Sequence, residues 1–396
     1  MKNLDDFEEE IYKCSRCGLC QTVCPVYKVT LNECSVSRTK FNMLNGVLKG
    51  DLSLNKKIME YMDLCLGCNA CKDFCPSNID AREIFTAVKS QYHRNKPAHL
   101  NSYFFFKSLL FCARVGFFGY RLLKLDKITD RVFSGTKNIL FKRVLLFNSL
   151  AKKNVFTKKT AGVIPLRKSK RAVFFKGCFN KYINDDSERA VKKIFANTDI
   201  EIVEKPFECC GVSLLSSGLE KEFLKVARHN LAQIPEDCDY ILTDCASCSF
   251  VLKSYKKYLP SDISQKVIGV LELLKNRKIS VDGENIKITA HKPCHEDFDF
   301  IKLLKSIEGA QYIEAENFDK CCGFSGKFAL NHQEISREIS KRKAQDILKT
   351  GADFVLTNCP ACKLGLNQGL IELGQKTPRV LNVIEFIAKY CSVEWS

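Results

Sequence analysis

ILTDCASC occupies residues 241–248, and VLTNCPAC occupies residues 355–362. Each phrase places a C-x2-C pair directly after a short apolar, β-branched run, which is typical of a buried strand that ends in a turn. Two other phrases recur in the same order: AVFFKGC at 172–178 and ECCG at 208–211, then KITAHKPC at 287–294 and KCCG at 320–323. Corresponding cysteines lie 112 to 116 residues apart. The C-terminal half is therefore an internal repeat.

Both copies alternate strand-like runs with helical stretches, which predicts an α/β domain whose cysteines gather at one edge of its sheet. Matching closing helices are expected at residues 267–274 and 380–387. Each copy supplies five cysteines as candidate metal ligands: Cys178, Cys209, Cys210, Cys245 and Cys248 in the first, and Cys294, Cys321, Cys322, Cys359 and Cys362 in the second.

Five thiolates are one more than a simple cubane cluster needs. Adjacent cysteines cannot easily occupy two corners of a compact cube, whereas a more open cluster with a bridging thiolate could use both. The glycine after each adjacent pair lets the backbone pass close to a metal. A structural zinc or reduced-thiol site in one or both copies is the alternative.

The N-terminus carries a second repeated pattern. C-x2-C-x2-C-x3-C-P occurs at residues 14–25 and again at 65–76. In bacterial ferredoxins the fourth cysteine of each run reaches the cluster held by the other run. We therefore predict two [4Fe–4S] clusters with exchanged ligands: Cys14, Cys17, Cys20 and Cys75 for cluster 1, and Cys65, Cys68, Cys71 and Cys24 for cluster 2. Structural zinc is the alternative, but it leaves the repeated four-cysteine run with its terminal proline unexplained.

Length and composition agree with a multidomain globular protein of a reducing compartment. The chain has 396 residues, 45% of them hydrophobic, and 22 cysteines. Their grouping in metal-ligand spacings argues against a disulfide framework. Because the N-terminus lacks a basic segment followed by an apolar run, we expect a cytoplasmic location. Helices are expected at residues 36–48 and 54–62, between the two ferredoxin runs.

A basic stretch links the two halves. Residues 101–170 hold sixteen Lys or Arg and two Asp, a net charge of +14 out of +17, together with ten Phe. Lys107, Arg114 and Arg121 interrupt the apolar run, so a spanning helix is not expected. Their spacing of seven places them on one side of a helix that could lie on an anionic membrane surface. Packing on the protein itself or on a partner is the alternative.

Other candidate residues have weaker roles. His291 and His295 flank Cys294, and we expect them to support the sulfur ligands through hydrogen bonds rather than to bind metal, with a purely structural role left open. Cys34, Cys112, Cys238 and Cys391 fall outside every motif and receive no function. Asp244, Glu272 and Glu385 are expected to be solvated or capping groups. No dinucleotide or P-loop motif is present, so a flavin would have to come from a partner.

The chain resembles proteins with a duplicated cysteine-rich CCG domain. FFKGCFNKY at 174–182, ECCGVSLLSSG at 208–218, HKPCH at 291–295 and CCGFSGKF at 321–328 carry the resemblance. They look most like the iron–sulfur subunit of anaerobic glycerol-3-phosphate dehydrogenase, and the arrangement also resembles the glycolate oxidase iron–sulfur subunit. Similarity to the heterodisulfide reductase catalytic subunit implies one or two further, non-cubane [4Fe–4S] clusters. Unlike many dehydrogenase subunits of this family, the chain retains all five cysteines in both copies.

The resemblance implies an α+β multidomain protein, with a helical two-cluster ferredoxin domain followed by two tandem α/β CCG repeats. The expected boundaries are 1–98 for the ferredoxin domain, 99–168 for the basic amphipathic connector, 169–282 for the first CCG domain and 283–396 for the second.

The expected function is electron transfer in a membrane-associated flavoprotein dehydrogenase that oxidises glycerol 3-phosphate or a small 2-hydroxy acid such as glycolate or lactate. Expected partners are the flavoprotein, a quinone or quinone-reducing subunit and the inner face of the cytoplasmic membrane, with no nucleic acid. The alternative is a heterodisulfide-reductase-like catalytic subunit that reduces a disulfide or similar substrate.

Overall fold

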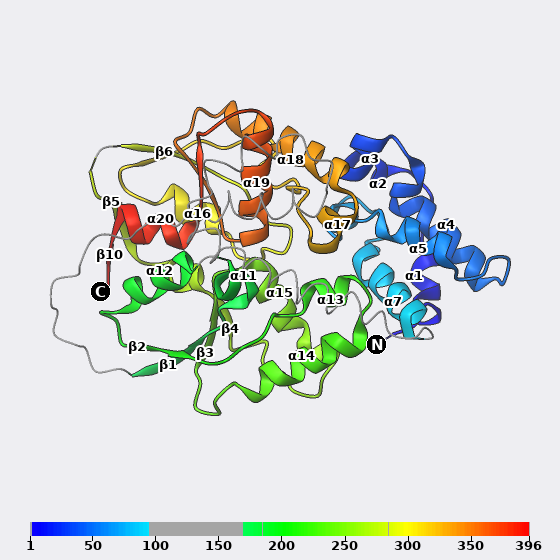
Figure 1. Cartoon of the computed structure of the whole chain (residues 1–396), viewed down its shortest axis with the longest axis horizontal. Helices are drawn as coiled ribbons and strands as arrows, with labels where there is room; N and C mark the ends of the chain where they lie inside the picture. Colours follow the sequence, from blue (N-terminus) through cyan, green and yellow to red (C-terminus); the bar gives the residue numbers. More distant parts are fainter. Residues whose placement is uncertain (1, 95–168, 184, 284, 396) are drawn as a thin grey trace, which may run out of the picture.

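The structure is a computed structural model that describes residues 2–94, 169–183, 185–283 and 285–395 (Figure 1). Residues 99–168, predicted to form a basic connector, lie outside the described residues, and so do Lys107, Arg114 and Arg121. Within the described part of the chain, no helix is long and apolar enough to cross a membrane.

The N-terminal module is helical and lies at one end of the molecule (Figure 1). Its helices are α1 Glu8–Tyr12, α2 Leu19–Val23, α3 Pro25–Thr30, α4 Ser37–Leu48, α5 Lys56–Asp63, α6 Ala70–Asp73 and α7 Ala81–Arg94. The helices predicted at 36–48 and 54–62 are thus confirmed as α4 and α5. Leu44, Met62 and Val88 are fully buried in their shared core. The cysteine runs occupy the loops and first turns between these helices.

Each cysteine-rich repeat contains a parallel four-stranded sheet. In the first repeat the strand order is β2-β1-β3-β4. Its elements are β1 Lys170–Phe174, α11 Gly177–Tyr182, α12 Asp186–Phe195, β2 Ile200–Glu204, α13 Val212–Ser216, α14 Glu220–Ala232, β3 Tyr240–Thr243, α15 Ala246–Ser254 and β4 Val267–Gly269. Val173, Phe174, Ile241 and Leu242 are fully buried, as expected of central parallel strands covered on both faces.

The second repeat has the same topology, with strand order β7-β6-β8-β9. Its elements are β6 Ile286–Ala290, α16 Phe300–Lys305, β7 Ala310–Tyr312, α17 Gly326–Asn331, α18 Gln333–Leu348, β8 Phe354–Thr357, α19 Pro360–Glu372, β9 Arg379–Asn382 and α20 Val383–Tyr390. The strands β5 Lys278–Val281 and β10 Cys391–Glu394 form an antiparallel pair that joins the end of the first repeat to the end of the second.

The prediction of closing helices was wrong at their starts. Residues 267–269 form β4 and residues 379–382 form β9, and a helix follows in each copy. In the first copy it is the short 3-10 helix η4 Val270–Leu274, and in the second it is α20. The β-branched residues at the start of each segment pair in parallel with β3 or β8, and this tertiary pairing overrides the helical pattern.

The two repeats share one core. Phe174 and Leu242 of the first repeat and Leu356 and Phe386 of the second belong to a single buried cluster. At its boundary, Glu385 of α20 accepts a hydrogen bond from the Ser187 hydroxyl of α12 at 2.9 Å.

The helical module docks on both repeats. Val26 and Leu66 of this module pack with Phe328 and Ile339 of the second repeat, and burying a side chain of this size contributes about 1.5–3 kcal/mol. Arg94 of α7 pairs with Glu220 of α14 at 2.7 Å.

Gly218 marks the tightest approach between the helical module and the first repeat. Its φ is +73°, and a Cβ there would lie 2.4 Å from the backbone carbonyl carbon of Lys89. A side chain would therefore strain the residue and push α7 away.

We expect Gly218→Ala to lower the free energy of unfolding by more than about 1 kcal/mol, through backbone strain and the clash with α7. Thermal unfolding and limited proteolysis would measure the loss. Gly50→Ala is the matched control, because Gly50 has a φ of +80° with nothing within 4 Å of the added Cβ. Equal destabilisation by both substitutions would contradict the importance of the docking contact.

Candidate metal centres

The first group of cysteines is assembled from both ferredoxin runs. Cys14, Cys17, Cys20 and Cys75 line one small cavity of about 30 Å³ between α2, α4 and α6. Burial raises the pKa of the Cys20 thiol, and the nearby Cys14 adds to the effect. The structure therefore brings together the four residues predicted for cluster 1, although Cys75 belongs to the other run.

The second group adjoins the first, because Cys71 also lines the small cavity of the first group. Burial raises the pKa of Cys24 to about 11, and Cys65 and Cys68 are the nearest thiols that contribute. Cys71 lies in the same neighbourhood, where burial raises its pKa to about 12 and Ser37 donates a hydrogen bond to its sulfur at 3.2 Å. Pro25 begins α3 directly after Cys24, and this turn directs Cys24 toward the other run. The arrangement is compatible with the exchanged ligand sets, which stay a prediction.

A buried lysine lies beside the second group. Lys40 is fully buried, and its ammonium donates to the carbonyl oxygens of Ser35 at 2.7 Å and Leu64 at 3.0 Å. Burial lowers the pKa of Lys40, while Cys65 and Cys24 act in the opposite direction. The sequence did not single out this residue, because a lysine within α4 does not differ in pattern from a solvent-exposed one.

The five cysteines of the first repeat meet at the carboxyl edge of its sheet. Cys178 begins α11 after β1, Cys209 and Cys210 follow β2, and Cys245 and Cys248 lie at the start of α15 after β3. A hydrogen bond with Cys209, together with burial, raises the pKa of Cys178 well above its usual range. The Gly211 N–H points at the Cys209 sulfur at 3.4 Å. This is the clustering that the sequence predicts.

The second repeat builds the corresponding site. Cys321 and Cys322 precede α17, and Cys359 and Cys362 lie at the start of α19. Cys294 hydrogen bonds with Cys321, which together with burial raises the pKa of the Cys294 thiol well above its usual range. The Gly323 N–H again points at the first sulfur of the adjacent pair, at 3.4 Å from Cys321.

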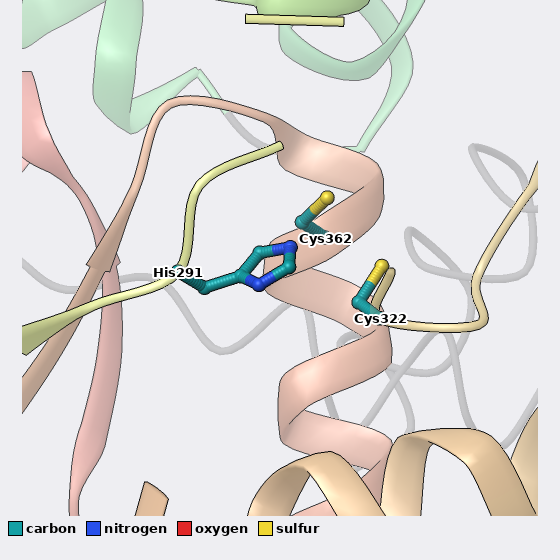
Figure 2. A group of neighbouring side chains, drawn as sticks. All are labelled: His291, Cys322 and Cys362. Atoms are coloured by element: carbon teal, nitrogen blue, oxygen red, sulfur yellow. The ribbon is translucent and has the colours of Figure 1, made fainter. Parts of the chain in front are cut away.

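The two predicted supporting histidines lie in different surroundings. His291 is fully buried in the second repeat, where its ring lies beside Cys322 and Cys362 (Figure 2). The His295 Nδ1 lies 3.1 Å from the Ser247 hydroxyl, and its ring stacks on Phe250 of the first repeat at 4.7 Å. His295 of the second repeat therefore contacts the first repeat. The Ser247 hydroxyl lies 3.7 Å from the Cys359 sulfur, so Ser247 contacts both His295 and a candidate metal ligand.

The cysteine groups adjoin one another across the module boundaries. The Cys321 thiol of the second repeat, together with burial, raises the pKa of Cys68 in the helical module well above its usual range. The Cys245 thiol of the first repeat likewise lies close enough to Cys359 of the second repeat to lower the pKa of Cys359. A cavity of about 400 Å³ is lined by cysteines from all three modules. The cysteine group of the second repeat therefore adjoins both the group of the helical module and the group of the first repeat, although the helical module itself contacts both repeats.

The donor sets fit iron–sulfur clusters. Each group offers at least four neighbouring thiols, and interactions between the thiols together with burial raise the pKa of several of them, including Cys68, Cys178 and Cys294. Iron in a cluster removes that penalty by binding the thiolates directly.

The residues without an assigned role lie away from the cysteine groups or support the fold. Cys238 is buried, and its thiol donates to the Tyr240 carbonyl oxygen at 2.9 Å. Cys34 and Cys391 are partly buried, and Cys112 lies outside the described residues. Glu272 and Glu385 cap helices, as expected. Asp244 is buried rather than solvated, and the Asn180 amide donates to its carboxylate at 3.0 Å.

Comparisons with known protein families match the cysteine-bearing part of each of the three modules. The cysteine-rich domain named CCG matches residues 172–253 and 288–367. The 4Fe-4S dicluster domain matches residues 10–79. A hypothetical protein from Helicobacter pylori has a similar fold, with a TM-score of 0.53 at 10% identity over 97% of this chain and 74% of that one.

Several curated relatives are iron–sulfur subunits. The probable glycolate oxidase iron–sulfur subunit of Bacillus subtilis is 24% identical, over 92% of this chain and 90% of that protein. The glycolate oxidase iron–sulfur subunit of Escherichia coli is 23% identical, over 89% of both. One subunit of the fumarate reductase (CoM/CoB) of Methanothermobacter marburgensis is 30% identical, over 55% of this chain and 46% of that protein.

Exchanged ligation makes a specific prediction. Cys24→Ser should remove the electron paramagnetic resonance signal that Cys65→Ser removes, because both sulfurs belong to cluster 2. Cys17→Ser should remove the other signal. Cys34→Ser, a matched substitution outside the cysteine groups, should leave both. The exchange would be refuted if Cys24→Ser and Cys17→Ser removed the same signal.

Lys40 should tune cluster 2 through its charge. The positive charge of the buried Lys40 ammonium favours the more negative, reduced state of cluster 2. Lys40→Met removes this charge, so the reduction potential of the cluster should fall. Loss of the two hydrogen bonds should also cost about 2 kcal/mol of unfolding free energy. Redox titration would measure the shift, and Lys49→Met, at an exposed position just after α4, is the control. An unchanged potential would show that the ammonium does not act on the cluster.

Proposed function

We propose that this chain, a member of the iron–sulfur proteins that join a 4Fe-4S dicluster domain to two cysteine-rich domains, is the electron-transferring subunit of a flavoprotein dehydrogenase for a small 2-hydroxy acid. It binds several [4Fe–4S] clusters and belongs with the iron–sulfur subunits of oxidoreductases that have a catalytic partner. Glycolate and lactate are the substrates that its relatives' names suggest, and glycerol 3-phosphate is the third candidate.

One observation carries the proposal: the cysteine groups form a continuous series. Cluster 1 borders cluster 2, since Cys71 lines the cavity of the first group. Cluster 2 borders the second repeat through Cys68 and Cys321, and the second repeat borders the first through Cys359 and Cys245. A series of adjacent redox sites is what electron transfer through a protein requires. The bound clusters supply the one-electron chemistry, and this chain positions them and shields them from water.

The chain's own residues have defined tasks in this proposal. The thiols hold the metals, Lys40 places positive charge beside cluster 2, and Ser37 donates a hydrogen bond to one of its candidate ligands. The described residues contain no flavin or nicotinamide motif, so the partner subunit would oxidise the substrate. Quinone as acceptor, and the inner membrane face as location, rest on the positive charge of residues 101–170 alone.

A second function has an observation in its favour. Both repeats keep all five cysteines, and the cavity of about 400 Å³ lies where the two sites meet. A disulfide substrate could be reduced there, as in the heterodisulfide-reductase-like alternative. The partial match to the fumarate reductase (CoM/CoB) of Methanothermobacter marburgensis supports this candidate.

The experiment that separates these functions is anaerobic reduction of the purified full-length chain together with a candidate flavoprotein dehydrogenase from the same organism. We expect glycolate, lactate or glycerol 3-phosphate to bleach the iron–sulfur absorbance when the flavoprotein is present, and not without it. Reduction of small disulfides by the chain alone, with no response to these three substrates, would overturn the dehydrogenase proposal.

Variants test the series itself in the same assay. Cys321→Ser should interrupt electron transfer between cluster 2 and the cluster of the first repeat. Electrons should then equilibrate between these two clusters more slowly than in the wild-type protein. Cys209→Ser should leave exchange between cluster 2 and the second repeat intact, because the first repeat lies at the end of the series. Equal effects of both substitutions would contradict the order.

A further inference from the structure

His291 is a fully buried imidazole that lies at the cysteine edge of the second repeat. It follows β6 directly, and its backbone N–H donates to the Leu356 carbonyl oxygen at 2.9 Å. Among the residues that the structure describes, neither ring nitrogen makes a well-formed hydrogen bond, although the Phe318 backbone lies close enough to act on the ring. An unsatisfied buried polar atom costs about 1–3 kcal/mol, and Phe318 can serve only one of the two nitrogens, so the other is available to a metal.

The ring lies among two candidate metal ligands. One of its nitrogens and the sulfurs of Cys322 and Cys362 all lie within 4.8 Å of one another (Figure 2). Metal–nitrogen and metal–sulfur bonds of about 2.0 and 2.3 Å place two tetrahedral ligands roughly 3.5 Å apart. The three atoms are therefore spaced for ligands of one iron or of neighbouring irons.

The first repeat shows that the fold does not need an imidazole here. Phe175 occupies the equivalent position after β1, and its backbone N–H donates to the Leu242 carbonyl oxygen at 2.8 Å, just as His291 donates to Leu356. Phe175 is also fully buried, and it packs on Phe207 at 4.9 Å. The two repeats thus place the same backbone beside the same cysteine edge, but only the second adds a nitrogen donor.

We propose that His291 supplies an imidazole nitrogen as an iron ligand of the second cysteine site, which makes that site a mixed histidine–cysteine centre, whereas thiolates alone hold the first. The inference rests on the proposed iron–sulfur occupancy of the second repeat. Histidine in place of thiolate raises the reduction potential of an iron–sulfur cluster. The second site therefore has the higher potential of the two, and His291 sets this difference.

The test uses the full-length protein, purified anaerobically with either 14N- or 15N-labelled histidine. Pulsed electron paramagnetic resonance of the signal that Cys321→Ser removes should show a strong coupling to one histidine nitrogen, which changes with the isotope. In His291→Phe this coupling should vanish, and the potential of the same centre should fall. Iron and sulfide content should be unchanged, because Phe175 shows that phenylalanine fits this position.

His295→Gln is the matched control, since His295 also lies beside the cysteine sites and hydrogen bonds to Ser247 instead. It should retain the nitrogen coupling. A coupling that survives His291→Phe, or a wild-type coupling as weak as that of a nitrogen that only hydrogen bonds to sulfur, would overturn the ligand assignment.

Metal analysis distinguishes failure of the histidine-ligand proposal from failure of the iron–sulfur proposal on which it rests. A second site with iron and sulfide but no strong nitrogen coupling refutes the histidine ligand and leaves the proposed electron-transfer function standing. A second site that holds zinc or no metal refutes the cluster on which both rest.

Discussion

The repulsion between buried thiolates is the constraint on which the rest of this structure depends. Cys178 and Cys294 illustrate it, because the neighbouring thiols Cys209 and Cys321, together with burial, raise the pKa of each well above its usual range. Such groups can carry charge together only if a cation lies among them. The metal is therefore part of the folded core, and the strands and helices serve to bring the sulfurs to it.

This constraint explains how the modules pack. Parallel strands deliver their following loops to one edge of a sheet, so each repeat has a single edge that carries thiols. The cysteine edges of the two repeats face each other and the helical module, as Cys245 with Cys359 and Cys68 with Cys321 show. Apolar side chains such as Leu66 and Phe328 pack around Cys68 and Cys321 at this junction. The contacts that hold the three modules together are thus the same contacts that bring their cysteine groups close to one another.

The sequence was informative where chemistry depends on local spacing. The C-x2-C-x2-C-x3-C-P runs predicted the helical module, and the offset of 112 to 116 residues predicted two α/β domains of one topology. It was less informative where tertiary pairing decides. β4 and β9 replaced the starts of the expected closing helices, because their residues could pair with β3 and β8. The burial of Lys40 could not be predicted for the same reason, since it depends on the packing of α4 against the second cysteine run.

Comparison of the two repeats identifies the residues that they share and overlooks functional positions at which they differ, such as His291. Repeat matching aligns the cysteines and so draws attention to what the copies share, whereas Phe175 and His291 differ at a position that the alignment treats as neutral. Only the structure shows that this position faces the metal site, because it places the ring beside Cys322 and Cys362. Two copies with identical thiols would offer electrons two sites of similar energy. If His291 binds iron as proposed, a single nitrogen donor in the repeat whose cysteines adjoin Cys68 makes the two sites unequal without disturbing the fold that they share. An unequal pair gives a symmetric duplication a preferred direction of electron flow.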